Sequence, residues 1–477
     1  MGRDSRRNES RPKLNHHLLS PAPDKLEKAL SVHEEIFQRV LRLPGVTAVD
    51  VGYAVLERKR QFIDLLAIRI HVKRKLLPSD LEGLGWPNLT DGKRYAAQKI
   101  VNEFPILGVE ITQSPEDENR LCVDGVPLDI IEAKYHPFNQ IHIDQPKLSV
   151  ELEDAELQRI SRGRVNTLVG GVSLGSSNGQ SGTLGAVVWD RTDASPCVLS
   201  NWHVLAGSLS AEVGQPSFQP AIFDGGNSSD VVARLKRWCF GRHGDAALAE
   251  IVSQRNYCSG EILGFWHPIS GTMKPQLNMT VCKWGRTTGF TEGFIDGIHL
   301  ATNIDYGGGL VRYFQDQIHI APLHSGREFS AGGDSGSLIV ARFKPDGAPM
   351  SRRTQSTNDE ERLQNRVYYA VGLLFAGDAP GSQFGEYGIA TSAESLEEKL
   401  EFSFQPLFVP RSSIRPQVEN FQRPNMGAVL PQGTRWRGPR PYSAVPGGTL
   451  KGGSPQPDAE RLGAGGGGGT SGGGGGG

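Results

Sequence analysis

Three short segments of this 477-residue chain carry residue types that together could perform acyl transfer. His203 follows the apolar run 198–201, Asp245 precedes an apolar run, and Ser335 lies in a glycine-rich turn. A serine hydroxyl is a poor nucleophile until an imidazole accepts its proton, and the imidazole needs a carboxylate that holds its tautomer and stabilises its charged form. The segments therefore predict Ser335 as nucleophile, His203 as general base and acid, and Asp245 as the orienting carboxylate.

The turn around Ser335 also predicts where a developing negative charge would be held. Gly332 and Gly333 permit a tight backbone before the serine. We expect the backbone N–H groups of Gly333 and Ser335 to form the oxyanion hole.

The order His, Asp, Ser and the motif Gly333-Asp334-Ser335-Gly336 resemble the chymotrypsin/trypsin-like serine protease family. The segment VCKWGRTTGFTEG at 281–293 is similar to one in bacterial α-lytic-type proteases. The whole arrangement also resembles intracellular bacterial trypsin-like proteins related to the plant narrow-leaf-type group. The resemblance covers residues 182 to about 400. It implies a double β-barrel and a serine endopeptidase that acts on protein or peptide substrates.

The resemblance also implies where the primary substrate pocket lies. Its walls would come from the residues before the serine motif and from the strand near 371–377, namely Phe329, Ser330, Ala331, Phe375, Ala376 and Gly377. No aspartate stands where a trypsin-like pocket would hold one, and an unpaired buried charge is costly. We expect an uncharged, small to medium apolar residue before the cleaved bond, unless the Glu328 side chain turns inward.

Some positions depart from the family pattern. Val204, Glu292 and Phe329 stand at or near positions where secreted relatives place cysteines, and this fits a reducing compartment. Phe375 stands where many relatives place a serine that hydrogen-bonds the catalytic aspartate. This substitution leaves the support of Asp245 in question.

The elements that must position these residues are mostly strands. From residue 182 onward, short apolar runs such as 198–201, 317–321, 337–342 and 367–375 alternate with turn residues, and a helix is expected at 394–400. Before them, Asp24 is a plausible N-cap of a helix that ends at Pro44, and strands are expected near 49–55, 66–72 and 126–131. The predicted fold class is mainly β, a chymotrypsin-like double β-barrel preceded by a small α+β domain, with disordered termini.

The predicted boundaries follow from these patterns. Residues 1–20 are expected to be disordered, 21–135 to form the α+β domain and 136–181 to be a linker leading into the barrel. Residues 182–403 would form the protease domain. Residues 404–477 would be a disordered tail, because a Pro- and Gly-rich composition cannot bury enough apolar surface to offset chain entropy.

The composition argues against several classes of partner, location and cofactor. The chain has 51 basic and 52 acidic residues and a formal net charge of −1, which argues against a nucleic-acid partner held by general phosphate attraction. Without an apolar leader or a run of 18 apolar residues, we expect no secretion and no membrane span, and hence the cytoplasm. The five cysteines are scattered without a CxxC pair, and His136, His142 and Asp144 are loosely spaced, so neither a metal nor another cofactor is expected.

Two alternatives remain open at this point. The chain could be a binding or scaffold protein on an inactive protease fold, with the N-terminal domain as its working part. It could also be a protease that acts only on itself. The sequence determines neither the physiological substrate nor the oligomeric state.

Overall fold

The computed structural model describes residues 19–56, 61–73, 108–113, 121–137, 159–178, 181–265, 267–323, 328–343, 366–378 and 387–406. Within these ranges the chain is mostly strand, and its strands fall into two large sheets. The helices with described bounds include α1 (Pro23–Val40), α5 (Trp202–Leu205) and α7 (Ala393–Lys399), with the 3-10 helices η2 (Ile222–Asp224) and η3 (Ser228–Asp230).

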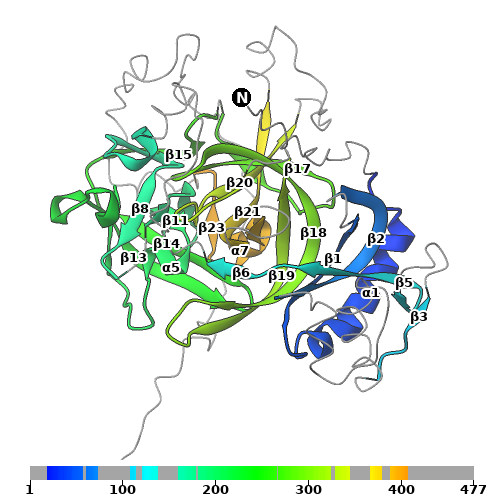
Figure 1. Ribbon diagram of the computed structural model, residues 1–477. Coiled ribbons are helices and arrows are strands. Elements are labelled where there is room, and N and C mark those ends of the chain that lie inside the picture. The colour runs from blue at the N-terminus through cyan, green and yellow to red at the C-terminus, as the bar shows by residue number, and fades with distance from the viewer. Residues whose placement is uncertain are drawn as a thin grey trace, which may run out of the picture. The chain divides into compact units, whose positions relative to one another are not determined.

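The first sheet forms the first barrel, with the strand order β7-β15-β10-β11-β14-β13-β12-β8-β9 and with β23 paired to β10. Its strands are β7 (Thr167–Gly170), β8 (Ser173–Ser176), β9 (Gly182–Thr183), β10 (Ala186–Asp190), β11 (Pro196–Ser200), β12 (Pro216–Phe218), β13 (Val231–Gly241), β14 (Gly244–Ile251), β15 (Asn256–Ile262) and β23 (Phe402–Ser403). In Figure 1, β8, β11, β13 and β14 lie together around α5.

The second barrel closes on itself, because the path β17-β20-β21-β22-β19-β18 returns through an additional β17–β18 pairing. Its strands are β17 (Thr280–Gly285), β18 (Gly289–Asp305), β19 (Val311–Pro322), β20 (Leu338–Phe343), β21 (Val367–Asp378) and β22 (Gly388–Ser392). Two short strands, β6 (Tyr135–Pro137) and β16 (Ile269–Thr272), also pair with β21.

The N-terminal strands extend the sheet of the second barrel. β18 pairs with β17 through its first half and with β1 through its second half, as in the pair Ala48 and Thr302. The sheet then continues through β1 (Val46–Leu56), β2 (Gln61–Val72), β5 (Val126–Glu132), β4 (Leu121–Val123) and β3 (Thr112–Gln113). α1 packs on β1 and β2, as Figure 1 shows.

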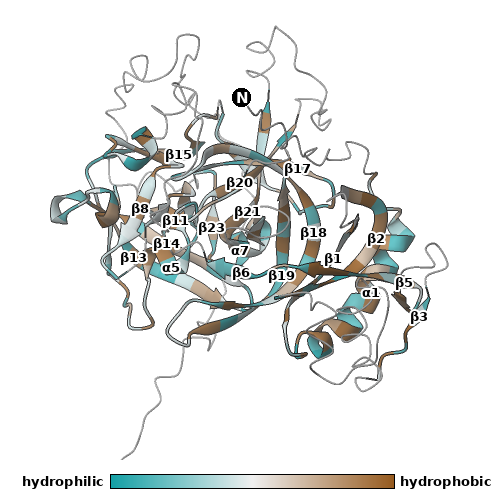
Figure 2. Ribbon diagram, in the orientation of Figure 1, coloured by the Kyte–Doolittle hydropathy of each residue, from teal (hydrophilic) through white to brown (hydrophobic). Residues whose placement is uncertain are grey.

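α1 begins one residue before its predicted cap. Its N-cap is Ala22 and its first residue is Pro23, so the prediction of Asp24 as N-cap was wrong. Proline suits the first helical position because its missing N–H would have no partner there. Asp24 instead lies in the first turn, where a negative charge favours the helix dipole. Figure 2 shows hydrophilic and hydrophobic residues on the same helix, as expected for an amphipathic element that packs on a sheet.

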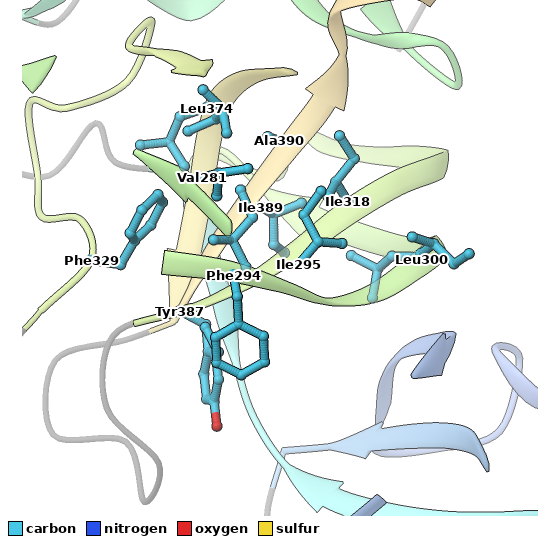
Figure 3. Close-up of a cluster of buried hydrophobic side chains, with 14 of the residues drawn as sticks. Val281, Phe294, Ile295, Leu300, Ile318, Phe329, Leu374, Tyr387, Ile389 and Ala390 are labelled. Atoms are coloured by element: carbon cyan, nitrogen blue, oxygen red, sulfur yellow. The ribbon is translucent and has the colours of Figure 1, made fainter. Parts of the chain in front are cut away.

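The core of the second barrel comes from alternating apolar residues of its strands. Figure 3 shows Phe294, Ile295, Ile318 and Ile389 packed together with their neighbours. The mainly β fold class with two barrel sheets is thereby confirmed.

The barrels also use residues outside the predicted 182–403 range. β7 and β8 precede residue 182 and belong to the first sheet. Phe404 is 2% exposed and packs on Phe402 with ring centroids 5.4 Å apart. The packed region therefore includes this residue, which was expected to begin the disordered tail. Apart from 19–20 and 404–406, the two termini predicted to be disordered lie outside the described residues.

Candidate active site

His203 lies in α5, the short helix that follows β11. Its imidazole Nδ1 is 2.5 Å from Asp245 Oδ2, and its backbone N–H donates to Asp245 Oδ1 at 3.2 Å. Asn201, two residues before His203, donates from its side-chain amide to the Asp245 carbonyl oxygen at 2.6 Å. The histidine segment is therefore fixed to one aspartate through both its backbone and its ring.

Asp245 reaches His203 because β11 and β14 are neighbouring antiparallel strands, with Ser200 opposite Ala247. The carboxylate is 0% exposed. A buried carboxylate is stable only where hydrogen-bond donors replace water. The side chains of His203 and Tyr306, together with the His203 amide, provide these donors.

The serine turn depends on glycine for two reasons. Gly333 and Gly336 have φ of +96° and +90°, which residues with a side chain rarely adopt. A Cβ on Gly336 would also collide with the Ser200 hydroxyl and the Thr183 carbonyl oxygen. Thr183 N–H donates to the Ser335 carbonyl oxygen at 2.7 Å. Glycine thus lets the serine turn of the second barrel approach the first barrel closely.

The histidine and serine segments come together beside Gly182. A Cβ on Gly182 would collide with Val204, the residue after His203, and would lie 2.9 Å from the Ser335 carbonyl oxygen. The Ser335 hydroxyl donates to the Phe375 carbonyl oxygen at 3.3 Å. His203 Nε2 is buried and has no hydrogen-bond partner among the described residues. His203 and Asp245 are thus joined by hydrogen bonds, and Ser335 is brought near them without a bond to the imidazole.

The backbone amides of the serine turn alternate between paired and unpaired. Asp334 N–H donates to the Ala331 carbonyl at 3.0 Å, and Gly336 N–H donates to the Leu374 carbonyl at 2.8 Å. Within the described part of the chain, the amides of Gly333 and Ser335 donate to no acceptor. These two unpaired amides are the ones that the sequence predicted as oxyanion donors.

Asp334 anchors this turn through a buried ion pair. Lys283 Nζ lies 3.1 Å from its carboxylate, and the Thr288 hydroxyl and Thr287 amide donate to it at 2.6 and 2.8 Å. Burial opposes ionisation of Asp334, but Lys283 and these donors outweigh it and hold the pKa below its usual value. Burial lowers the pKa of Lys283, and Asp334 counteracts that effect. The 281–293 segment thus fixes the backbone that carries Ser335.

The predicted pocket residues lie close to the core of the second barrel. Phe329 and Ser330 are buried, Ala331 is partly buried, and Phe375, Ala376 and Gly377 are buried in β21. Ser330 Oγ has no hydrogen-bond partner among the described residues. Glu328 is exposed, so its side chain is not turned inward.

The Phe329 ring occupies space left by two glycines. A Cβ on Gly293 would lie 2.8 Å from this ring, and a Cβ on Gly388 would lie 3.0 Å from it. Figure 3 shows Phe329 at the edge of the cluster that contains Phe294 and Ile389. The ring therefore packs inside the core of the second barrel.

Tyr306 also belongs to the site, although its sequence context did not predict it. Its hydroxyl donates to Asp245 Oδ2 at 2.6 Å, from the turn between β18 and β19. Burial and the Asp245 carboxylate raise the pKa of this phenol well above its usual value, so it keeps its proton. Three glycines follow this tyrosine, but nothing in that local pattern indicates which residue the hydroxyl reaches.

The positions compared with family cysteines have other partners here. Cys282 faces Glu292 across the β17–β18 pair, and Glu292 forms an ion pair with Arg342. Val204 is buried against Gly182. All five cysteines are free thiols.

The described residues contain no group of three or more His, Cys, Asp or Glu side chains that could hold a metal ion. His136 lies in β6, and His142 and Asp144 lie outside the described residues. Among these residues, no helix is long and apolar enough to cross a membrane.

Comparisons with known proteins found similarity only among solved structures. No family model and no curated protein matches the chain. Nocardiopsis protease is 15% identical and covers 50% of this chain and 98% of its own, with a TM-score of 0.33. Thermobifida fusca protease A is 14% identical and covers 50% of this chain and 97% of its own, with a TM-score of 0.33. An α-lytic protease homologue, N4, is 14% identical and covers 50% of this chain and all of its own, with a TM-score of 0.34.

These structural neighbours are chymotrypsin-like serine proteases. The two barrel sheets of the chain form a double β-barrel.

Proposed function

We propose that this chain is a serine endopeptidase that hydrolyses peptide bonds through Ser335, His203 and Asp245. One observation carries the proposal. The His203 imidazole is bound at Nδ1 by a buried carboxylate and is unpaired at Nε2 within the described residues, and it lies near a serine turn. This arrangement leaves one imidazole nitrogen available to accept a proton.

The chemistry follows from these groups. The Ser335 oxygen attacks the substrate carbonyl carbon as His203 Nε2 takes the hydroxyl proton, and Asp245 stabilises the imidazolium that forms. The amides of Gly333 and Ser335 would hold the oxyanion. His203 then gives its proton to the departing amine, the C–N bond breaks, and an acyl-enzyme remains. A water molecule, deprotonated by His203, hydrolyses the acyl-enzyme and frees Ser335.

The proposed substrates have a small, uncharged residue before the cleaved bond. Phe329 is buried in the apolar core of the second barrel, and Glu328 is exposed to solvent. A charged substrate side chain would find no partner from these two residues, and its burial would cost several kcal/mol. A peptide library should show Ala, Val or Leu at this position. A dominant Arg or Lys preference would contradict this specificity.

We further propose a cytoplasmic setting and the finer resemblance to α-lytic-type and narrow-leaf-type proteins. The free thiols, and Glu292 facing Cys282, support a fold that does not depend on disulfides. We also propose that residues 21–135 form a domain with its own role. Its hydrophobic cluster between α1 and the strands β1, β2 and β5 supports this division.

The test is labelling of the full-length protein with a fluorophosphonate probe. Wild-type protein should react, and Ser335→Ala should not. Ser217→Ala is the matched control, because Ser217 is also a buried serine but lies in β12 of the first barrel. Folded wild-type protein that fails to react would overturn the proposal, and labelling that survives Ser335→Ala would move the nucleophile elsewhere.

A second candidate is a binding protein on an inactive protease fold. The observation that favours it is the Ser335 hydroxyl, which bonds to the Phe375 carbonyl oxygen instead of His203. Absence of labelling together with retained fold would support this candidate. A protease that acts only on itself would be labelled, would cleave no added peptide and would show a shortened chain by intact-mass measurement.

A further inference from the structure

The carboxylate of Asp245 has a second side-chain donor besides the histidine. Its Oδ2 accepts from His203 Nδ1–H at 2.5 Å and from the Tyr306 hydroxyl at 2.6 Å. Its Oδ1 accepts from the His203 backbone N–H at 3.2 Å. A backbone amide thus holds Oδ1, and two side chains, the His203 imidazole and the Tyr306 phenol, hold Oδ2.

Tyr306 reaches this carboxylate from the other barrel. It follows the last residue of β18, and its backbone N–H donates to the Leu310 carbonyl at 2.9 Å, which closes the turn before β19. The intervening Gly307, Gly308 and Gly309 have φ of +87°, +60° and +82°, a conformation that other residues rarely adopt. The turn is therefore built on glycine, and the tyrosine stands at its base.

Aromatic packing fixes the ring as well. The Tyr306 ring lies 5.0 Å from Phe240 at 79° and 5.8 Å from the His203 ring. Phe240 is stacked on Trp202, the residue before His203, at 3.7 Å. Phe240 thus packs on Tyr306, which binds Asp245, and on Trp202, which precedes His203.

The Phe375 side chain on β21 supplies no donor to Asp245. Its side chain can donate no hydrogen bond, and its ring packs on Phe314 at 4.8 Å. Phe314 in turn lies 6.2 Å from the Tyr306 ring. Phe375 of β21 therefore makes an apolar contact with Phe314, and the hydroxyl that binds Asp245 comes from Tyr306 in the β18–β19 hairpin.

We propose that Tyr306 is a positioning residue that holds the Asp245 carboxylate in the orientation required by His203. This inference rests on the proposed function. The phenol remains a donor throughout the working pH range because its pKa is well above the usual value. The charged groups around it are Asp245, His203 when protonated, and Arg312, whose guanidinium lies over Phe240 at 5.2 Å.

The test compares Tyr306→Phe with wild type in the full chain, using fluorophosphonate labelling and peptide cleavage. Loss of a hydrogen bond to a charged group should lower kcat about 10- to 100-fold. KM should change little, since the tyrosine does not touch the substrate in this scheme. The carboxylate, relieved of one donor, should bind the imidazolium more strongly and shift the acid limb of kcat/KM to higher pH. The low-field proton NMR signal of His203 Nδ1–H should move as well.

Tyr313→Phe is the matched control, because its hydroxyl bonds to Gln315 at 3.1 Å on β19 and not to the site. It should leave the rate and the pH profile unchanged. A Tyr306→Phe protein with wild-type rate, wild-type acid limb and unmoved NMR signal would overturn the inference. Absence of labelling in wild type would instead overturn the proposed function, so the two failures are distinguishable.

Discussion

The described residues contain two buried histidine–aspartate–tyrosine clusters, and their histidines differ in whether Nε2 is paired. In the candidate site, His203 Nδ1 binds Asp245, and the Tyr306 hydroxyl binds the same carboxylate. The other cluster lies where the N-terminal strands join the second barrel, and there His319 Nδ1 binds Asp296 at 2.9 Å. His319 Nε2 is bound by the Tyr135 hydroxyl at 2.9 Å, whereas His203 Nε2 has no partner among the described residues.

The second cluster continues into a chain of paired groups. The Tyr135 hydroxyl lies 2.6 Å from His71 Nδ1, and His71 Nε2 lies 3.2 Å from Asp50 Oδ1. Arg69 binds Asp50 through two nitrogens, with Nε at 2.7 Å from Oδ1, and binds Asp296 through Nη1 at 2.6 Å. All these side chains are buried. Each ionised carboxylate therefore faces a guanidinium.

Residue types alone do not distinguish a reactive site from a structural one. Both clusters place an imidazole on a buried carboxylate. A fully paired network stabilises and specifies the packing, whereas an unpaired imidazole nitrogen beside a serine turn can accept a proton. On this reading, His319 joins strands and His203 is available for proton transfer.

The largest expected effect separates the two histidines. His203→Ala should lower kcat/KM by about 10⁴-fold or more, since the imidazole is the proposed base. His319→Ala should leave the labelling rate per folded molecule unchanged and reduce the free energy of unfolding by about 2–4 kcal/mol, because Asp296 and Tyr135 lose a buried partner. Labelling rates and urea unfolding of both variants measure the contrast. Equal losses of activity in the two variants would show that the two histidines do not differ in function.

Arg69→Met should give the largest loss of stability. It leaves Asp50 and Asp296 as buried carboxylates without their guanidinium, and such a change costs about 3–5 kcal/mol. The control is Arg39→Met on α1, whose ion pair with Glu35 is exposed to solvent and is expected to contribute less than about 1 kcal/mol. Urea unfolding compares the two variants. A loss for Arg69→Met no greater than that of the control would show that the second cluster is not structural.

Another buried histidine, His33, sharpens the comparison, because no carboxylate among the described residues is hydrogen-bonded to it. His33 Nε2 lies 3.4 Å from the Val49 carbonyl oxygen, and burial lowers the pKa of His33 to about 4. The folded state thus prefers the neutral ring. Its contribution to stability is present above the unfolded pKa of about 6.5 and is lost as pH falls toward 4, by about 3 kcal/mol. Unfolding measured at several pH values should show this acid loss in wild type and a smaller one in His33→Leu. Parallel curves would contradict the assignment.

The smallest expected effect concerns the two tyrosines. Tyr135→Phe should cost about 1–2 kcal/mol of stability, because one hydroxyl that bonds two histidines is lost. It should leave the labelling rate per folded molecule unchanged, in contrast to Tyr306→Phe. Thermal unfolding and labelling of both variants test this pair. A slower labelling rate in Tyr135→Phe would mean that the second cluster also influences the site.

Local patterns were sufficient to predict several strands and two segments of the candidate site. Apolar alternation predicted β1, β2 and β5, and the motifs around His203 and Ser335 predicted two segments that the fold brings together. These features depend on short stretches of chain, where strand period and glycine conformation are visible in the sequence.

Features that depend on distant strands were not predictable. Tyr306 reaches Asp245 across 61 positions of sequence, and Arg69 reaches Asp296 across 227. Their partners are decided by which strands become neighbours. Phe404 was assigned to the tail because the composition beyond it is poor in apolar residues, yet one aromatic ring is enough to pack on Phe402. The average composition of a long segment does not reveal a single residue that packs on the folded region.

The long strand β18 has a consequence for any shortened form of the chain. Its second half, near Ala301 and Thr302, is hydrogen-bonded on one side by β19 and on the other by β1. Without β1, the N–H and C=O groups on that side would become an open edge. Open sheet edges accept strands from other molecules and promote aggregation. β1 therefore covers a sheet edge of the second barrel that would otherwise be open to strands of other molecules.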